Sequence, residues 1–259
     1  MRADFSSIPK SGPVVAIDGP AGTGKSSTTR RLAEVLGFTH IDTGAMYRSI
    51  ALLIREKSEF IESLDSMASL AGLPVAAEAV RLSDEVKLEF KRMPKRNPSN
   101  RIFANGRDVT DLIRSPEVSM AASRISAIPG VRQTLSRLQR ELGCNGKAIL
   151  EGRDIGTVVF PDADVKFYLT ASVEERAKRR LAELEAAGAD VSSYEDLKAQ
   201  IVTRDHEDSS RAVAPLRRAE DAILVDTSNL AFDEVVQTIE RSVRENLGIQ
   251  KFEKGKIGL

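Results

Sequence analysis

The sequence predicts a three-layer α/β fold with a five-stranded parallel sheet, and two observations predict it. Short apolar runs alternate with longer segments of helical periodicity, which is typical of parallel strands covered by helices on both faces. The Asn105-Gly106 dipeptide lies among alternating apolar and polar residues and predicts a small antiparallel β insertion. The predicted parallel strands are Val14–Ile17, Phe38–Ile41, Ala148–Glu151, Val165–Leu169 and Ala222–Val225.

A phosphate-loop pattern, G-x-x-x-x-G-K-[ST], follows the first apolar run and opens the first helix, so the fold class is a P-loop fold. Backbone N–H groups of such a loop converge on a polyphosphate, Lys25 reaches the terminal phosphates, and the Ser26 hydroxyl ligates Mg²⁺. The alternative is a glycine-rich turn that binds nothing. The predicted ATP-binding residues are Gly19, Pro20, Ala21, Gly22, Thr23, Gly24, Lys25, Ser26 and Ser27.

Helical periodicity and helix-ending residues predict the elements that follow. A helix is expected over 25–36 with Gly37 as its C-terminal cap, and Asp42 or Thr43 is placed to cap the next helix. A further helix is predicted over 60–72. The remaining predicted helices are 117–128, 131–142, 174–187, 194–208 and 232–247.

Residues 75–112 are predicted to form the antiparallel β insertion, because apolar and polar residues alternate there and the Asn-Gly turn follows. The insertion contains a basic stretch, residues 91–98. Such a stretch is typical of a solvated loop, and contact with nucleic acid is the alternative.

The composition favours small-molecule partners. The 259 residues include 38 Lys+Arg and 38 Asp+Glu, so no charge surplus points to nucleic acid or to an anionic membrane. A single cysteine, Cys144, excludes an internal disulfide framework. Neither a signal peptide nor a membrane span is recognisable, and a soluble cytoplasmic protein is expected.

Three segments are expected around one crevice, because ligands of open parallel sheets bind beyond the carboxyl ends of the strands. They are the phosphate loop, residues 42–48 and residues 152–154. Arg48 and Arg153 favour a second anionic ligand, since guanidinium groups bind phosphate bidentately. A surface ion pair is the alternative for each arginine.

Arg204, Asp208 and Arg211 are spaced so that they share one side of a helix, if the helix continues through them. A solvated helix end is the alternative. An arginine-bearing lid would neutralise charge during phosphoryl transfer and exclude water. Asp226 is a candidate acidic residue beside Mg²⁺, although apolar strands often end in aspartate.

Other classes of protein lack their motifs here. The chain contains no D-x-x-G and no N-K-x-D, which excludes a switch-type GTPase, and no G-x-S-x-G elbow of a serine hydrolase. His40 and His206 are far apart and no Cys/His spacing exists, so no metal site made wholly of protein is predicted.

Four motifs in order resemble those of the bacterial cytidylate kinases, from about Val14 to Leu247. They are Ile17–Ser26, Asp42–Arg48, Gly152–Pro161 and the segment from Arg204 to Leu216. The resemblance implies a nucleoside monophosphate kinase with a core sheet, a monophosphate-binding region enlarged by an antiparallel sheet, and a lid.

The resemblance also implies how the chain is divided. A single kinase domain is expected at 14–249, between tails at 1–13 and 250–259. Its core comprises about 14–42, 144–187 and 219–249, the monophosphate-binding region about 43–143 with the insertion 75–112, and the lid about 188–218.

Carried over onto this sequence, the family pattern assigns roles to individual residues. It implies catalytic roles for Lys25, Arg153, Arg204 and Arg211. It implies CMP contacts at Thr43 and Tyr47, phosphate contacts at Arg48, Arg153 and Arg211, base contacts at Ser123, Arg132 and Asp154, and ribose contacts at Arg204 and Asp208.

The predicted reaction is Mg²⁺-assisted transfer of a phosphoryl group from ATP to CMP or dCMP, in pyrimidine nucleotide metabolism. The predicted partners are these nucleotides, with no stable nucleic acid, no membrane and a monomeric state. One alternative is a P-loop kinase for another small acceptor such as UMP. Another is an ATP-binding regulatory protein that holds RNA through residues 91–96.

Overall fold

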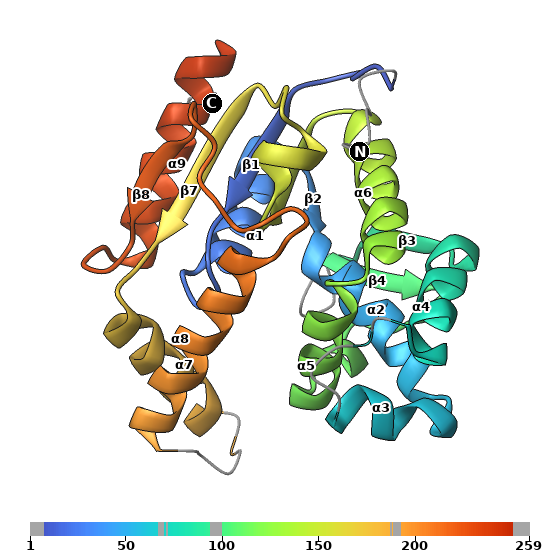
Figure 1. Cartoon of the computed structure of the whole chain (residues 1–259). Helices are drawn as coiled ribbons and strands as arrows, with labels where there is room; N and C mark the ends of the chain where they lie inside the picture. The colour runs from blue at the N-terminus through green and yellow to red at the C-terminus, as the bar shows by residue number, and fades with distance from the viewer. Residues whose placement is uncertain are drawn as a thin grey trace.

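A five-stranded parallel sheet forms the centre of the molecule, and a separate three-stranded antiparallel sheet lies beside it (Figure 1). The computed structural model describes residues 8–66, 70, 72–93, 100–186, 188 and 193–250. The strand order of the large sheet is β2-β6-β1-β7-β8, and every neighbouring pair is parallel. These strands are β1 (Val14–Asp18), β2 (Thr39–Asp42), β6 (Ala148–Gly152), β7 (Val165–Thr170) and β8 (Ile223–Asp226). The predicted five-stranded sheet is confirmed.

The middle strand, β1, is buried along its whole length, and its side chains alternate between two hydrophobic clusters. Val14 and Ala16 face one cluster, while Val15 and Ile17 face the other. Such two-sided burial explains why the strand is a continuous apolar run instead of an alternating one. Helices α1 (Lys25–Leu36) and α9 (Phe232–Leu247) pack with each other on the second face.

Between β2 and β6 the chain forms several helices together with the small sheet. These helices are α2 (Thr43–Arg55), α3 (Ile61–Ser66), α4 (Pro74–Glu85), α5 (Pro116–Ile125) and α6 (Pro129–Cys144), with short helices η1 (Ser58–Phe60) and η2 (Leu112–Arg114). Asp42 caps α2 by accepting a hydrogen bond from the Ala45 N–H at 2.9 Å, as its position predicted. The predicted helix over 60–72 is present as α3 from Ile61 to Ser66, and residues 67–69 and 71 of the predicted span lie outside the described residues.

The insertion begins later than the sequence predicted, because residues 74–85 form helix α4 instead of strands. Pro74 occupies the first turn, where its missing N–H costs nothing, and Val75, Ala79 and Ser83 are buried four residues apart on one face. The antiparallel strands are β3 (Leu88–Arg92), β4 (Asn100–Ala104) and β5 (Arg107–Asp108). The alternation of Val80 and Leu82 is incidental, whereas Leu88 and Phe90 alternate within strand β3 as predicted. Part of the basic stretch, residues 94–98, lies outside the described residues.

Helix α7 (Val173–Ala186) and helix α8 (Tyr194–Ser210), of which α8 lies in the predicted lid, pack against each other below the sheet in Figure 1. Ser193 and Asp196 form a capping box at the start of α8. Helix α8 ends at Ser210, so Arg211 is extended and does not continue the helical face, contrary to the conditional prediction. Residues 189–192 of the predicted lid lie outside the description, as do residues 1–7 and 251–259 of the predicted tails.

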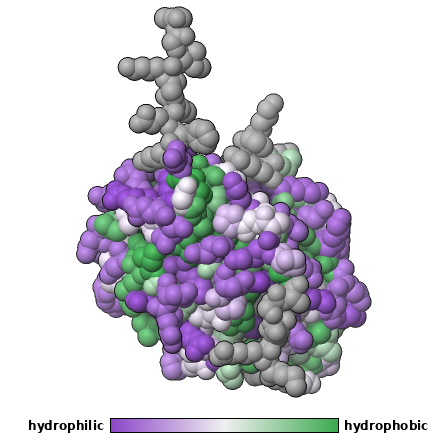
Figure 2. All heavy atoms as spheres, turned by 90° about the horizontal axis from the view of Figure 1, so that it is seen from above, coloured by the Kyte–Doolittle hydropathy of each residue, from purple (hydrophilic) through white to green (hydrophobic). Residues whose placement is uncertain are grey.

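The face seen in Figure 2 is mainly hydrophilic, and its hydrophobic side chains gather in smaller separate patches. Many large apolar side chains, including Phe160 and Phe167, are buried, whereas Met120, Leu224 and Phe232 are exposed. Within the described residues, no helix is both long and apolar enough to cross a membrane.

Candidate active site

The phosphate loop bends around glycines that no other residue could replace without strain. Gly19 has a φ of 145°, and a Cβ there would lie 2.0 Å from the Leu169 carbonyl oxygen of β7. Gly24 has a φ of 82° and stands at the N-cap of α1. The loop therefore presents backbone N–H groups at the start of a helix, which is an arrangement suited to a polyphosphate.

Lys25 is buried inside this loop. Its ammonium group donates to the Pro20 carbonyl oxygen and to Thr23 Oγ1, the latter at 3.3 Å. Burial lowers the pKa of Lys25 well below its usual value, and the positive charge of Arg153 lowers it further. Because burial disfavours the charged form of Lys25, a nearby anion would stabilise its ammonium group strongly. The loop is therefore suited to bind negatively charged phosphate groups.

Ser26, the predicted Mg²⁺ ligand, donates a hydrogen bond of 2.6 Å from its hydroxyl to Glu151 Oε2. Glu151 is buried at the end of β6, the strand beside β1. The pair brings a hydroxyl and a carboxylate together, and oxygen ligands of this kind suit Mg²⁺. Asp226, the alternative candidate, lies on the edge strand β8 and accepts hydrogen bonds from Ser228.

A buried ion pair joins α6 to the segment just after β6. Arg132 Nη1 of α6 lies 2.6 Å from Asp154 Oδ2, just beyond β6, and both residues are buried. The Arg132 guanidinium also lies over the Tyr47 ring, 5.5 Å from its centroid. Burial raises the pKa of Tyr47 to about 12, so its phenol remains protonated at neutral pH. The sequence-predicted residues Tyr47, Arg132 and Asp154 are thus brought together.

Arg48 on α2 pairs with Asp42, with 3.0 Å between Nη2 and Oδ2. Its Nε atom is buried and has no hydrogen-bond partner among the described residues. An unsatisfied buried donor of this kind is suited to a ligand oxygen. Thr43 instead donates to the Glu151 carbonyl oxygen at 2.6 Å, which ties the start of α2 to β6.

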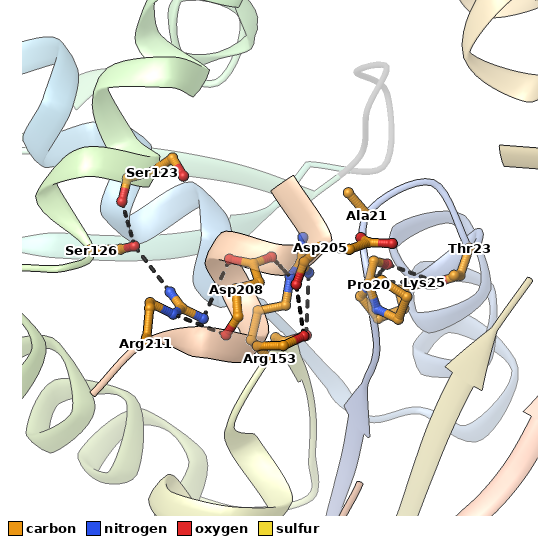
Figure 3. A network of polar contacts seen from close by, with 12 residues as sticks. Pro20, Ala21, Thr23, Lys25, Ser123, Ser126, Arg153, Asp205, Asp208 and Arg211 are labelled. Carbon is orange, nitrogen blue, oxygen red and sulfur yellow. Dashed lines mark hydrogen bonds and ion pairs between the residues drawn. The ribbon is translucent and has the colours of Figure 1, made fainter. Parts of the chain in front are cut away.

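Asp208 on α8 and Arg211 just after it contact residues from other parts of the chain (Figure 3). Arg153 Nε donates to Asp208 Oδ2 at 2.8 Å, and Arg211 Nη1 donates to Ser126 Oγ at 3.2 Å. Although burial opposes ionisation of Asp208, the charges of Arg153 and Arg211 lower its pKa. Asp208 is therefore paired both with Arg153, which follows β6, and with Arg211, which follows α8.

Three other predicted residues, Arg204, Ser123 and Ser27, form fewer side-chain contacts among the described residues. Arg204 is solvent-exposed along part of its surface, yet the surrounding protein and the nearby Arg153 lower its pKa to about 10. Within the described part of the chain, Ser123 makes no side-chain hydrogen bond and contributes its carbonyl oxygen to Ser126. Ser27 is exposed on α1. Their substrate contacts remain predictions.

Three contributors were missed by the sequence prediction. Glu151 follows an apolar run, so the rule on strand ends could have identified it. Asp18 also ends a strand, and its carboxylate accepts hydrogen bonds from the N–H groups of Ile155 and Gly156 at 2.9 and 2.7 Å. Ser126 carried no local signal, because its contact with Arg211 depends on the tertiary fold.

A profile of the cytidylate kinase family matches residues 15–245, which is most of the chain. The chain belongs to the cytidylate kinase family. The cytidylate kinase of Geobacter sulfurreducens is 49% identical over 241 residues, covering 93% of this chain and 97% of that protein. A bifunctional pantoate ligase/cytidylate kinase of Synechococcus sp. is 47% identical over 92% of this chain, and the match covers 42% of that protein.

The fold also resembles that of a shikimate kinase from Acinetobacter baumannii, solved in complex with shikimate. The TM-score is 0.41 at 16% identity, with 92% of this chain and 96% of that chain covered. The assignment to the cytidylate kinase family rests on the sequence matches and not on this similarity.

Proposed function

We propose that the protein transfers the γ-phosphoryl group of ATP to the 5′-phosphate of CMP or dCMP, giving ADP and the corresponding diphosphate. The single observation that carries the choice of acceptor is the buried Arg132–Asp154 pair facing the arginines of the crevice. Cytosine offers an amino group that donates to a carboxylate and ring acceptors for a guanidinium. The pair therefore supports recognition of a cytosine base.

The reaction requires no general base, since the acceptor phosphate is already a nucleophile at neutral pH. The chain's own contribution is alignment and charge: the phosphate loop and Lys25 hold the donor, while Arg48, Arg153 and Arg211 hold the acceptor phosphate. Arg204 approaches from the lid. Closure of α8 over both nucleotides would exclude water that competes for the phosphoryl group.

The donor set fits Mg²⁺, because a hydroxyl and a carboxylate oxygen lie together beside the phosphate loop. Ser26 would hold the ion directly and Glu151 would hold its water ligands. The ion, when bound, would neutralise negative charge on the phosphates of ATP during transfer. Within this proposal the protein acts as a cytoplasmic enzyme of pyrimidine nucleotide metabolism.

A coupled assay of ADP release with a panel of acceptors tests the proposal. The acceptors are CMP, dCMP, UMP, AMP, GMP and shikimate at matched concentrations with Mg²⁺ and ATP. We expect the highest kcat/KM for CMP and dCMP. A higher kcat/KM for UMP or for shikimate would overturn the proposed acceptor, and no ADP release with any acceptor would overturn the proposed reaction.

A further inference from the structure

A chain of polar contacts, buried at its centre, runs from the antiparallel insertion to the phosphate loop. It begins at Asn100 on β4, passes through His40 on β2 and Glu151 on β6, and ends at Ser26 on α1. His40 and Glu151 are buried. The described reaction uses Glu151 and Ser26 but gives no role to His40 or Asn100.

Asn100 fixes the tautomer of His40. Its Nδ2 atom lies 3.0 Å from the His40 carbonyl oxygen and 3.1 Å from His40 Nδ1. A carbonyl oxygen can only accept a hydrogen bond, so the atom facing it is the amide NH₂ group and the orientation of Asn100 follows. The same group then donates to Nδ1, which must be the unprotonated ring nitrogen.

The other ring nitrogen therefore carries the proton and donates to Glu151. His40 Nε2 lies 2.8 Å from Glu151 Oε1, while Glu151 Oε2 accepts from Ser26. Each carboxylate oxygen thus has one fixed donor, and the carboxylate plane is held in a single orientation next to the phosphate loop. A carboxylate with only one donor would be free to rotate.

We propose that His40 is a positioning residue that orients Glu151 toward the metal of the bound nucleotide, and that Asn100 sets the His40 ring for this task. The inference rests on the proposed Mg²⁺ site. It also connects the two substrates, because Asn100 belongs to the insertion on the acceptor side whereas Ser26 belongs to the donor loop. Partners that orient metal ligands in this way commonly contribute tenfold or more to metal affinity.

The test measures metal binding directly, with Mn²⁺ as the probe. Mn²⁺ is titrated into the enzyme with saturating ADP, and electron paramagnetic resonance reports the free ion. We expect His40→Leu to weaken Mn²⁺ binding in the ternary complex about tenfold. We expect His40→Gln, whose amide can still donate to Glu151, to restore most of the affinity.

Asn100→Leu extends the test to the insertion. Although Asn100 does not contact Glu151, we expect this variant to weaken Mn²⁺ binding in the same direction, and the double variant with His40→Leu to be no weaker than His40→Leu alone. Thr110→Val is the matched control, because it removes a buried hydrogen bond to Ile102 within the same insertion. Its Mn²⁺ affinity should equal that of the wild type.

The outcomes separate this inference from the proposed function. Unchanged Mn²⁺ affinity in a folded His40→Leu variant, or equal losses in His40→Leu and Thr110→Val, overturns the role of His40 alone. If the wild-type complex binds Mn²⁺ no more tightly than ADP alone does, the proposed metal site and the role of His40 both fall. Thermal melts monitored by circular dichroism establish that each variant is folded.

Discussion

The proposed donor half and the proposed acceptor half of the site are built in different ways. The donor half is one continuous segment, in which backbone groups and Lys25 are held by contacts within the same loop. The acceptor half is assembled from side chains on α2, α6, the end of β6 and the lid, joined by ion pairs such as Arg132–Asp154 and Arg153–Asp208. Local sequence specifies the first half, whereas only the tertiary fold creates the second.

The comparison predicts that one substitution in the donor half is enough to lower the rate of phosphoryl transfer strongly. Lys25→Ala should lower kcat about a thousandfold, because it removes a preorganised charge from the phosphates of ATP. The fold should survive, since burial already opposes the charge of Lys25. Steady-state kinetics and a thermal melt measure both effects. Lys10→Ala, which removes a surface pair with Asp164, is the control, and an active Lys25→Ala enzyme would contradict the mechanism.

Asp18 connects the two halves, because it ends the strand before the phosphate loop and accepts hydrogen bonds from backbone groups just after Asp154. Burial raises its pKa from 3.8 to about 6. Its contribution to the free energy of unfolding is therefore full below pH 3.8 and is lost as the pH rises through about 6. A shift of this size corresponds to about 3 kcal/mol in total.

The measurement compares wild type with Asp18→Asn, which does not titrate. Chemical denaturation at several pH values gives both free energies of unfolding. Between pH 4 and pH 7 the wild type should lose about 2 kcal/mol relative to the variant, because part of the loss precedes pH 4. A difference between the two proteins that is independent of pH would refute the raised pKa.

Asp154→Asn probes the acceptor half without emptying the site. The amide keeps the shape but loses the charge that attracts Arg132 and the cytosine amino group, and charged hydrogen bonds of this kind contribute about 2 kcal/mol. We expect kcat/KM for CMP to fall about thirtyfold. The KM for MgATP should stay within about twofold of wild type, since Asp154 pairs with Arg132 and not with Lys25 of the phosphate loop. Equal losses for both substrates would argue against base recognition.

Ser126→Ala gives the smallest expected effect and tests the lid contact that the sequence did not reveal. Losing the hydrogen bond from Arg211 costs about 1 kcal/mol, so KM for CMP should rise about fivefold while kcat changes little. Titration of CMP at saturating ATP provides the measurement. Ser83→Ala removes another buried serine, on α4, and serves as the control. An identical response of the two variants would indicate a general loss of stability instead.

The two halves also differ in how far the sequence could predict them. The phosphate loop and the five parallel strands follow from residues that are adjacent in the chain, such as the apolar run before Gly19. Helix α4 was mistaken for strands, because Val80 and Leu82 alternate by chance while the buried face repeats every four residues. Ser126 has a polar side chain without any pattern, and its role depends on Arg211, 85 residues away.

Resemblance to a family supplied the acceptor residues that spacing alone could not. The structure adds which of them meet, and it adds Glu151, which no motif singled out. Arg211 shows the limit of spacing as evidence. Its spacing from Asp208 suggested that the two residues share one helical face, yet α8 ends at Ser210 and Arg211 has an extended backbone. The two side chains still form an ion pair, because they are only three residues apart.

The pairing of each acceptor arginine with a carboxylate has a further consequence. Arg48, Arg132 and Arg153 already have anionic partners in Asp42, Asp154 and Asp208. In the proposed reaction an arriving phosphate would compete with Asp42 for Arg48 and with Asp208 for Arg153, and the net positive charge of the site is smaller than the number of arginines suggests. Binding would then be an exchange of partners, in which Asp208 leaves Arg153 and accepts a hydrogen bond from a hydroxyl group of the sugar.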